Sequence, residues 1–399
     1  MRVGRGSCFS PQSAWPSVRS SVQNPQMNVD LYRPLFPASR HLHYLNHAGV
    51  SPSSTRVRDE VRRWTDDLVE NGVLNIEAWI RREREVRATA ARLIGARPEE
   101  IAFVRNTSHG IATFAEGLNW QAGDEVALCL SEEYPSNLYP WMHLESRGVV
   151  LRPIESRLGG VTPEAAAAAL TSRTRVLSVS SVQFATGART DLQALGQLCR
   201  ARGVLFCVDG IQSLGAFPLD VERAHIDFLS SDSHKWQLGL PGIGFAYVRQ
   251  SVLPLLRPPA VGWKSIRHPL DFDSRRLDLR DDAAKLEEGT PNHLGIFGMG
   301  AALDLLLEVG IAPIAAHITD WLEVLARELA TLGCDPRPGL ALRAGILTFA
   351  PPRESGETFM ARAEKAGVVL SLRRGRVRVS PHFYTGQAEM DALLGLLRA

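Results

Sequence analysis

The stretch Ser230–Val248, SSDSHKWQLGLPGIGFAYV, places a lysine between a strand-like run and a glycine-rich turn. The chain has only four lysines among its 45 basic residues, so arginine supplies nearly all of its positive charge. A guanidinium stays protonated, whereas a lysine at the carboxyl end of a buried strand can lose its proton and act as a nucleophile. A lysine beside a turn is more often a solvated surface charge, so the interpretation of Lys235 depends on the residues around it.

Short apolar runs bounded by turn residues recur along the chain. We interpret six of them as buried strands, at residues 125–130, 148–154, 175–182, 204–210, 226–232 and 243–248. Helical patterns lie between them, for example at 162–172 and 190–203. Strands that alternate with helices predict an α/β fold, in which a mostly parallel sheet has helices on both faces. Ligands of such sheets bind at the carboxyl ends of the strands.

The pattern changes after Gly289. Two long helices are predicted there, at residues 293–310 and 314–333. An α+β region with a helix near 355–366 follows, and a last helix spans Gln387–Arg398. We therefore predict a large domain over residues 27–290 and a smaller α+β domain over residues 291–399. Residues 27–50 are expected to pack near the small domain.

The N-terminal 26 residues differ in composition from the rest of the chain. They contain no acidic residue and are rich in Ser, Pro and Arg. We expect residues 1–26 to be a disordered tail or an extension upstream of a true start at Met27. A transit peptide is the alternative, although the apolar core of a secretory signal is absent.

The overall composition is that of an ordinary globular protein, with 45% hydrophobic residues, 22% charged residues and a net charge of +2. It indicates neither a nucleic-acid nor a membrane partner, and no apolar run approaches the roughly 20 residues of a membrane helix. Five cysteines without a CxxC pair argue against a disulfide framework and a structural zinc site, and we predict a cytoplasmic protein. His41, His43 and His47 fit no recognised spacing of metal ligands, so no metal is expected.

Two further sites lie where they could serve the same cavity as Lys235. Asp209 ends the strand before the one that leads to Lys235, and neighbouring strands would project both side chains into one crevice. An aspartate beside a protonated pyridine nitrogen makes pyridoxal phosphate an electron sink, although an Asp–Gly turn is the simpler interpretation of Asp209 alone. Thr107 and Ser108 precede a helix expected to begin near His109, where hydroxyls and free N–H groups can bind phosphate or simply cap the helix.

Seven motifs in order resemble those of the class V aminotransferase family of fold-type-I pyridoxal-phosphate enzymes. The resemblance runs from Tyr44 to Arg398, and the motifs are YLNHAGVSP at 44–52, RNTSHGI at 105–111, EEYPSNLYPW at 132–141, CVDGIQS at 207–213, SSDSHKW at 230–236, EEGTPN at 287–292 and RVRVSPHFY at 376–384. The family includes cysteine desulfurases, selenocysteine lyases, C–S lyases, kynureninases and isopenicillin N epimerase-like proteins. The resemblance implies pyridoxal 5'-phosphate as the cofactor and a seven-stranded type of sheet in the large domain.

The resemblance also implies roles for individual residues. Lys235 would form the Schiff base with the cofactor, and Asp209 would be the partner of the pyridine nitrogen. The other cofactor contacts would be Gln212 and Gln183 near the ring substituents, Tyr134 stacked on the ring, and Thr107, Ser108 and His234 at the phosphate.

Substrate binding and assembly follow from the same resemblance. Arg378 would bind the substrate carboxylate as a two-pronged donor, with Asn46 nearby, whereas the neighbouring Arg373, Arg374 and Arg376 are interpreted as solvated. Thr290 would reach the phosphate of a neighbouring subunit, which predicts a homodimer. Trp263, Arg189 and His382 are expected to contribute to the specificity pocket for an amino-acid substrate.

The reaction is narrowed by one departure from the family's pattern. Persulfide-forming desulfurases carry a reactive cysteine shortly before the carboxylate arginine, and residues 367–377, GVVLSLRRGRV, contain none. We therefore expect a C–S or C–Se β-lyase that works through an external aldimine and a quinonoid, with Lys235 as general base. A class V aminotransferase and an amino-acid epimerase are the alternatives. A non-catalytic cofactor-binding protein is disfavoured because Lys235, Asp209 and Arg378 are all present.

Overall fold

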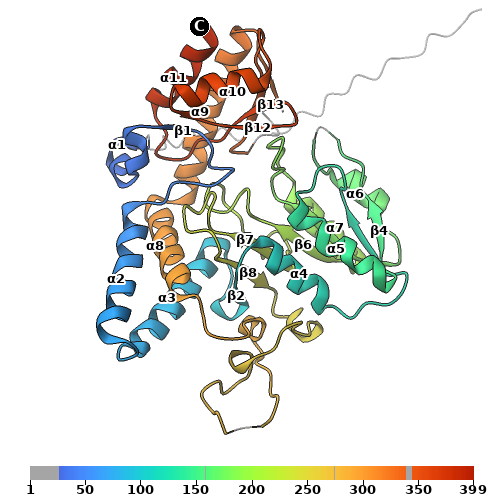
Figure 1. The fold of residues 1–399 in the computed structure, drawn as a ribbon. Coiled ribbons are helices and arrows are strands. Elements are labelled where there is room, and N and C mark those ends of the chain that lie inside the picture. The colour runs from blue at the N-terminus through green and yellow to red at the C-terminus, as the bar shows by residue number, and fades with distance from the viewer. Residues whose placement is uncertain (1–26, 158, 274, 338–343) are drawn as a thin grey trace, which may run out of the picture.

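The computed structural model describes residues 27–399 apart from 158, 274 and 338–343. Its centre is a seven-stranded sheet in the order β2-β8-β7-β6-β5-β3-β4 (Figure 1). The strands are short and almost wholly buried except at the β4 edge, as the apolar runs of the sequence predict. Their bounds are β2 Ile101–Val104, β3 Glu125–Leu128, β4 Val150–Pro153, β5 Thr174–Ser180, β6 Leu205–Asp209, β7 Phe228–Asp232 and β8 Gly244–Val248.

The sheet is mostly parallel. Strands β4, β3, β5, β6 and β7 run in the same direction, and β8 is antiparallel to both of its neighbours, β7 and β2. In the register Ser180 lies opposite Asp209, and Asp209 lies opposite Ser230. The carboxyl ends of β5, β6 and β7 therefore meet at one edge. This arrangement confirms the predicted α/β fold with a mostly parallel seven-stranded sheet.

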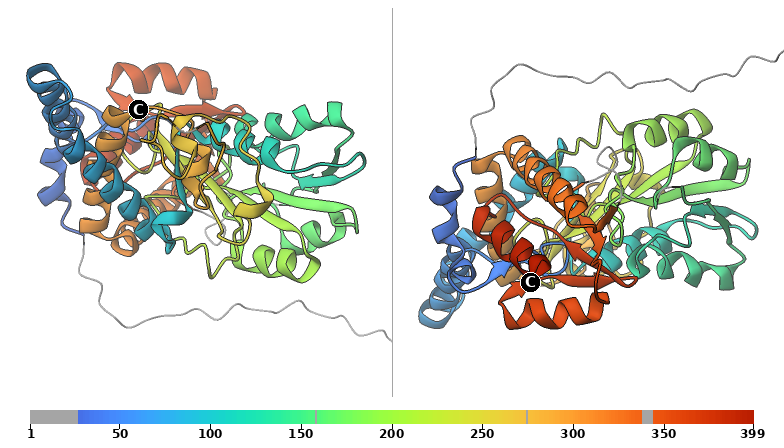
Figure 2. Two further views of the ribbon diagram at one scale, coloured as in Figure 1. Left: turned by 90° about the horizontal axis from the view of Figure 1, so that it is seen from below. Right: turned by 90° about the horizontal axis from the view of Figure 1, so that it is seen from above.

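Helices cover both faces of the large sheet (Figure 2). Alternate strand residues point to opposite faces, so Phe228 and Leu229 belong to two different apolar clusters. On one face α4, Thr107–Gly117, places Phe114 in a stack on Phe228 with ring centroids 4.4 Å apart. On the other face α7, Leu192–Arg202, buries Leu195 in the cluster that contains Leu229. The smaller helices of these layers are α5 Tyr139–His143 and α6 Pro163–Ala169.

Three long helices pack together at the β2 side of the sheet (Figure 1). They are α2 Thr55–Asn71, α3 Ile76–Ile94 and α8 His293–Val309. Helix α8 is buried along most of its length because α2 and α3 both lie against it. Between β8 and α8 the chain makes a long excursion of loops and short 3-10 turns, which projects beyond the sheet in Figure 1.

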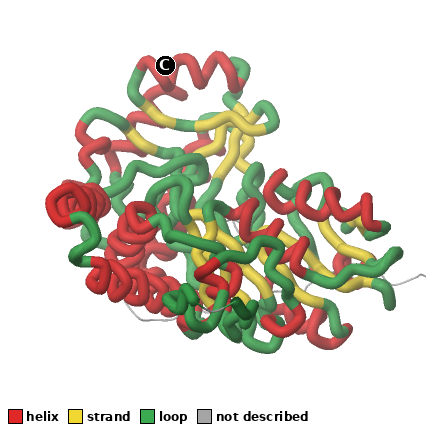
Figure 3. Tube along the Cα trace, turned by 60° about the horizontal axis from the view of Figure 1, so that its bottom comes forward, coloured by secondary structure: helices red, strands yellow, loops and turns green. Residues whose placement is uncertain are grey.

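The C-terminal part has a separate, smaller sheet, which Figure 3 shows apart from the large one. Its order is β12-β13-β10-β9, and all its pairings are antiparallel. The elements are α9 Ile311–Thr331, β9 Asp335–Arg337, β10 Leu347–Ala350, α10 Gly356–Lys365, β11 Val368–Val369, β12 Ser371–Arg373, β13 Arg376–Val379 and α11 Gln387–Arg398. The N-terminal segment joins this part, because β1, His43–Tyr44, pairs with β11 and Arg33 forms an ion pair of 2.6 Å with Glu389. A domain boundary at residue 290 stays a prediction.

Within the described ranges, no single helix has the length and apolar composition that a membrane span requires. The consecutive helices α8 and α9 reach those limits only when taken together, and the chain bends by 77° between them.

Candidate active site

A cavity of about 350 Å³ lies at the carboxyl edge of the large sheet, where the small sheet also contributes side chains. Seven of the predicted site residues line it, namely Thr107, Ser108, Tyr134, Gln212, His234, Lys235 and Arg378. Asp209 is the last residue of β6 and lies at the same edge of the sheet. The cavity also has lining residues that were not assigned from the sequence, above all Asp232, Ser136, Phe184 and Arg373.

Lys235 reaches the cavity because β7 ends at Asp232 and the chain turns back into β8. The turn is tight, since the Leu238 N–H donates to the Lys235 carbonyl at 2.9 Å and Leu238 has a φ of 60°. Burial lowers the pKa of Lys235 to about 8, with Asp209 opposing the shift and Arg378 adding to it. Its Nζ lies 5.5 Å from the centre of the Tyr134 ring.

Asp209 has the features expected of a partner for a protonated ring nitrogen. It is 2% exposed, and its Oδ1 accepts a hydrogen bond of 3.0 Å from the Ile211 N–H. Its Oδ2 is buried without a hydrogen-bond partner among the described residues. Burial raises the pKa of Asp209 to about 7, and the nearby Glu133 adds to this effect. Because a buried polar atom needs a partner, the orphaned oxygen fits a donor supplied by a bound molecule.

The polar groups beside the start of α4 are suited to bind an anion. Helix α4 begins at Thr107, slightly earlier than predicted, and its first two residues, Thr107 and Ser108, line the cavity. The N–H groups of a helix start favour an anion there. The Thr107 hydroxyl accepts from the Asp232 N–H at 3.0 Å, which leaves its own proton free to donate. Ser108 donates to Ser136 at 2.7 Å, and His234 Nδ1 lies 3.0 Å from Asp232 Oδ1. Together with the Asp209 oxygen, this set fits pyridoxal phosphate.

The two glutamines that were predicted to contact the cofactor differ in their position relative to the cavity. Gln212 lines the cavity, but its amide is engaged at both ends, accepting from Trp236 Nε1 at 2.9 Å and donating to the Ala48 carbonyl at 3.2 Å. Gln183 is fully buried behind the lining, where its amide donates to Glu133 at 3.0 Å.

Glu133 is a buried carboxylate of the site region that sequence reasoning missed. It accepts hydrogen bonds from Asn137 at 2.8 Å, from Gln183 and from the backbone and hydroxyl of Ser180, and burial raises its pKa. It therefore ties the loop after β3 to the end of β5. The signal that could have found it is its place directly before Tyr134 in the motif EEYPSN.

Arg378 is buried to 1% exposure in β13. Its Nε donates to Ser371 at 2.9 Å, its Nη1 to the Phe184 carbonyl at 2.7 Å and its Nη2 to Asn46 at 3.4 Å. Burial and the neighbouring Arg373 lower the pKa of Arg378 to about 9. Asn46 thus lies against Arg378 rather than in the lining of the cavity.

Some predicted residues lie elsewhere. Trp263, Arg189 and His382 do not line the cavity, and His382 is instead buried with its Nε2 2.9 Å from the Trp236 carbonyl. Thr290 is exposed and lies outside the cavity of its own chain, so its role toward a partner subunit, and with it the homodimer, stays a prediction. Of the three arginines interpreted as solvated, Arg374 is exposed, whereas Arg373 and Arg376 are half-buried, and Arg373 lines the cavity.

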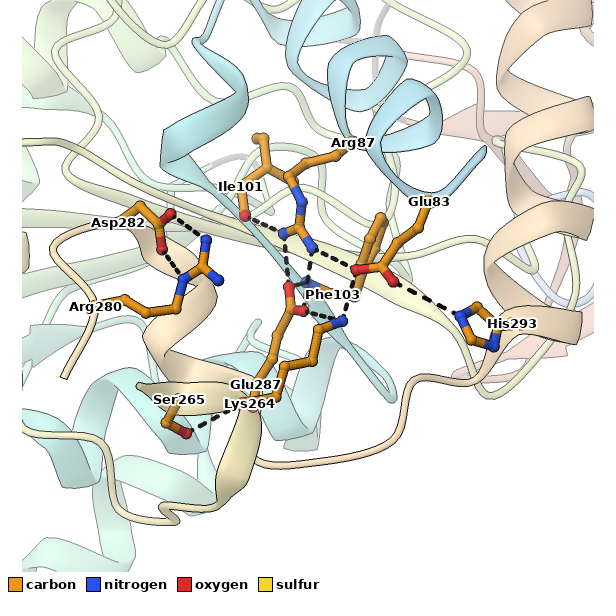
Figure 4. Close-up of polar contacts among 10 residues, drawn as sticks. All are labelled: Glu83, Arg87, Ile101, Phe103, Lys264, Ser265, Arg280, Asp282, Glu287 and His293. Carbon is orange, nitrogen blue, oxygen red and sulfur yellow. Dashed lines mark hydrogen bonds and ion pairs between the residues drawn. The ribbon is translucent and has the colours of Figure 1, made fainter. Parts of the chain in front are cut away.

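The segment that carries Thr290 is held at its base by a buried network of charges (Figure 4). Arg87 of α3 grips both oxygens of Glu287, at 2.6 and 3.1 Å, and Lys264 lies 3.2 Å from Glu287 and 2.6 Å from Glu83. Burial opposes ionisation of Glu83, but His293, Lys264 and Arg87 lower its pKa to about 2. The two carboxylates and the two cations balance one another in a site with little access to water.

The chain is similar to known proteins in sequence and in fold. The family model described as aminotransferase class-V matches residues 43–350. A "Probable cysteine desulfurase" of Methanothermobacter thermautotrophicus is 30% identical over 78% of this chain and 82% of its own length. The "Uncharacterized aminotransferase YcbU" of Bacillus subtilis is 26% identical over 90% of this chain and 94% of its own. A solved structure of the cystine C–S lyase C-DES with its product cysteine persulfide has a TM-score of 0.85, 24% identity, and coverage of 91% of this chain and 98% of that one.

The chain therefore belongs to the class-V aminotransferase family. Its membership confirms the resemblance drawn from the seven motifs. The protein is a pyridoxal-phosphate-dependent enzyme, as predicted. The likeness to C-DES concerns the fold, whereas the residue roles given above rest on the arrangement of this chain's own side chains.

Rebinding of pyridoxal phosphate to the cofactor-free protein should depend on pH through Lys235. Covalent attachment needs the neutral amine, and at pH 7 about 10% of a lysine with the pKa of about 8 is neutral, against about 0.03% at the ordinary 10.5. The rate of the visible absorbance change is expected to rise about tenfold per pH unit below pH 8 and to level off above it. A rate that still climbs at pH 9.5 would show that the amine is not shifted.

Proposed function

We propose that this enzyme is a C–S or C–Se β-lyase that needs no cysteine persulfide. The observation that carries the proposal is that none of the described cysteines lines the cavity. Cys129, Cys199, Cys207 and Cys334 are buried, and burial raises the pKa of each thiol, that of Cys199 to about 12. A persulfide pathway needs an accessible thiolate beside the substrate. Names that refer to C–S bond chemistry among the relatives and structural neighbours support the substrate class.

The side chains around the cavity can divide the work of such a reaction. Pyridoxal phosphate, when bound, takes up the electron pair left at the substrate Cα. Asp209 would keep the ring nitrogen protonated, and Thr107 and His234 would hold the phosphate. Arg378 would orient the α-carboxylate with parallel hydrogen bonds.

Lys235 would move the proton. Its amine, with a pKa near 8, is matched to accept the Cα proton close to neutral pH. The Cβ–S bond then breaks with its electron pair going to sulfur, which leaves as a thiol. The remaining enamine hydrolyses to pyruvate and ammonia, so the atoms balance without an enzyme thiol.

The test is product analysis with S-methyl-L-cysteine before and after treatment with iodoacetamide. We expect pyruvate, ammonia and methanethiol in equal amounts, at rates that alkylation changes by less than about twofold. With free L-cysteine, a persulfide desulfurase would instead release alanine and lose its activity on alkylation. Alanine formation that iodoacetamide blocks would overturn the proposal.

Transamination is the second candidate, because the relative with the greatest coverage quoted above carries an aminotransferase name. The same assays separate the two reactions. Amino transfer to a keto acid, with no pyruvate released from S-methyl-L-cysteine, would select the aminotransferase.

A further inference from the structure

Arg373 is a cationic side chain of the cavity to which the proposed function gives no task. It ends β12, is half-buried and lines the cavity together with Arg378. Within the described residues no carboxylate forms an ion pair with it, and its guanidinium donates only to the adjacent Leu372 carbonyl, at 2.7 Å. A guanidinium that faces a binding cavity without a carboxylate partner is available to an anion.

The register of the small sheet fixes where Arg373 lies. Ser371 is opposite Arg378, and Arg373 is opposite Arg376. Residues two apart on a strand share a face, so Ser371, Arg373, Arg376 and Arg378 all lie on the same face of the β12–β13 hairpin. Of these arginines, only Arg373 and Arg378 line the cavity. The hydrogen bond of 2.9 Å from Arg378 to Ser371 is consistent with this placement. Arg373 is therefore a neighbour of the carboxylate arginine by strand pairing.

The hairpin is also tied to the wall of the cavity. Its turn residues, Arg374 and Gly375, have φ values of 50° and 73°, as a tight two-residue turn requires. Arg374 reaches across to the loop after β3, with 3.0 Å to Glu132 and 2.6 Å to the Ser131 carbonyl. This loop carries Tyr134, which also lines the cavity. These contacts of Arg374 hold Arg373 beside the space where substrate would lie.

The charges that line the cavity leave Arg373 unmatched. Asp232 lies 3.0 Å from His234, and Lys235 and Arg378 have tasks in the proposed function. Burial is the main cause of the lowered pKa values of Arg378 and Lys235, and the positive charge of Arg373 lowers both pKa values further. One positive charge therefore remains for an anion other than the phosphate and the α-carboxylate.

We propose that Arg373 binds a second carboxylate, carried on the side chain of the substrate. The preferred substrates are then amino acids with an acidic side chain, such as cysteines whose sulfur bears a carboxylate group. The inference rests on the proposed function for the place of the α-carboxylate at Arg378, and it names the substrate class. In the competing arrangement Arg373 and Arg378 bind the α-carboxylate together.

A matched pair of ligands distinguishes these arrangements. S-carboxymethyl-L-cysteine and S-carbamoylmethyl-L-cysteine differ only by a carboxylate in place of an amide. Their dissociation constants are measured from the amplitude of the rapid change in visible absorbance on mixing with the holoenzyme, before the ligand is consumed. We expect the wild-type enzyme to bind the acid about tenfold or more tightly than the amide, as a charge-assisted contact does. In Arg373→Gln the two constants should become equal within about twofold, with the amide bound as before.

Arg376→Gln is the matched control, because Arg376 lies opposite Arg373 but pairs with Asp335 and does not line the cavity. It should keep the wild-type preference, and Arg373→Lys, which keeps the charge without the paired donors, should keep part of it. The proposal is overturned if the wild-type enzyme does not prefer the acid, if neither ligand changes the absorbance, or if Arg373→Gln weakens the binding of both ligands equally.

Pyruvate release from both ligands is followed in parallel. A preference without pyruvate would reject the lyase and keep the role of Arg373, and pyruvate without a preference would do the reverse.

Discussion

Lys235→Ala is expected to abolish turnover, with a loss of about 10⁴-fold or more, and to remove the absorbance band near the visible edge. The loss is large because one amine performs two tasks, the covalent attachment of the cofactor and the transfer of the Cα proton. Arginine could not replace it, since a guanidinium neither forms the Schiff base nor gives up its proton near neutral pH. The measurements are the absorbance spectrum of the purified protein and its rate with S-methyl-L-cysteine.

Lys365→Ala is the matched control, because Lys365 is exposed at the end of α10 and away from the cavity. This variant should keep both the band and the rate. Addition of a small primary amine should restore part of the activity of Lys235→Ala, because it supplies the missing base from solution. Turnover by Lys235→Ala at the wild-type rate would refute the role of this residue.

The sequence was sufficient for the fold because its strands are continuous apolar runs. All six predicted strands agree with observed strands to within two residues at each end, and the helix from Gln387 to Arg398 has the predicted ends. Strand β2, Ile101–Val104, was missed because four apolar residues cannot be told from the start or end of a helix. Helices α2 and α3 were not predicted, although both have an apolar side that packs on α8.

The site was predictable where it depends on motif spacing and not where it depends on tertiary contact. Lys235 follows the strand that pairs with the Asp209 strand, so parallel register brings them to one edge. Arg373 resembles its arginine neighbours in sequence, and only tertiary contacts separate it from them, because Arg374 pairs with Glu132 and Arg376 with Asp335. Glu133 is ordinary in sequence and becomes notable through burial, which depends on residues far along the chain.

Glu287→Gln is expected to lower the free energy of unfolding by about 3–5 kcal/mol, the usual cost of removing one partner of a buried ion pair. Glu287 is 7% exposed and Arg87 13%, so water cannot compensate for the lost charge. In the variant, Arg87 and Lys264 would share the single carboxylate of Glu83, and one positive charge would remain unbalanced. Thermal unfolding of the cofactor-free protein is the measurement, because bound cofactor would add its own stabilisation.

Glu308→Gln makes the same chemical change at the surface. Glu308 pairs with Arg56 through both oxygens, but the side chains are 49% and 41% exposed, so the loss should stay below about 1 kcal/mol. Equal losses in the two variants would show that the buried network has no special weight.

A double variant tests whether charge imbalance is the cause. Glu287→Gln combined with Arg87→Met removes one charge of each sign and leaves the Lys264–Glu83 pair, 2.6 Å apart, balanced. Buried ion pairs can often be replaced as a unit at little cost, so this protein should be more stable than Glu287→Gln alone. The stability of Arg87→Met alone is measured as well. If the losses of stability in Glu287→Gln and Arg87→Met simply add in the double variant, the effect of Glu287 comes from its hydrogen bond to the Phe103 N–H and from packing, and not from the balance of buried charge.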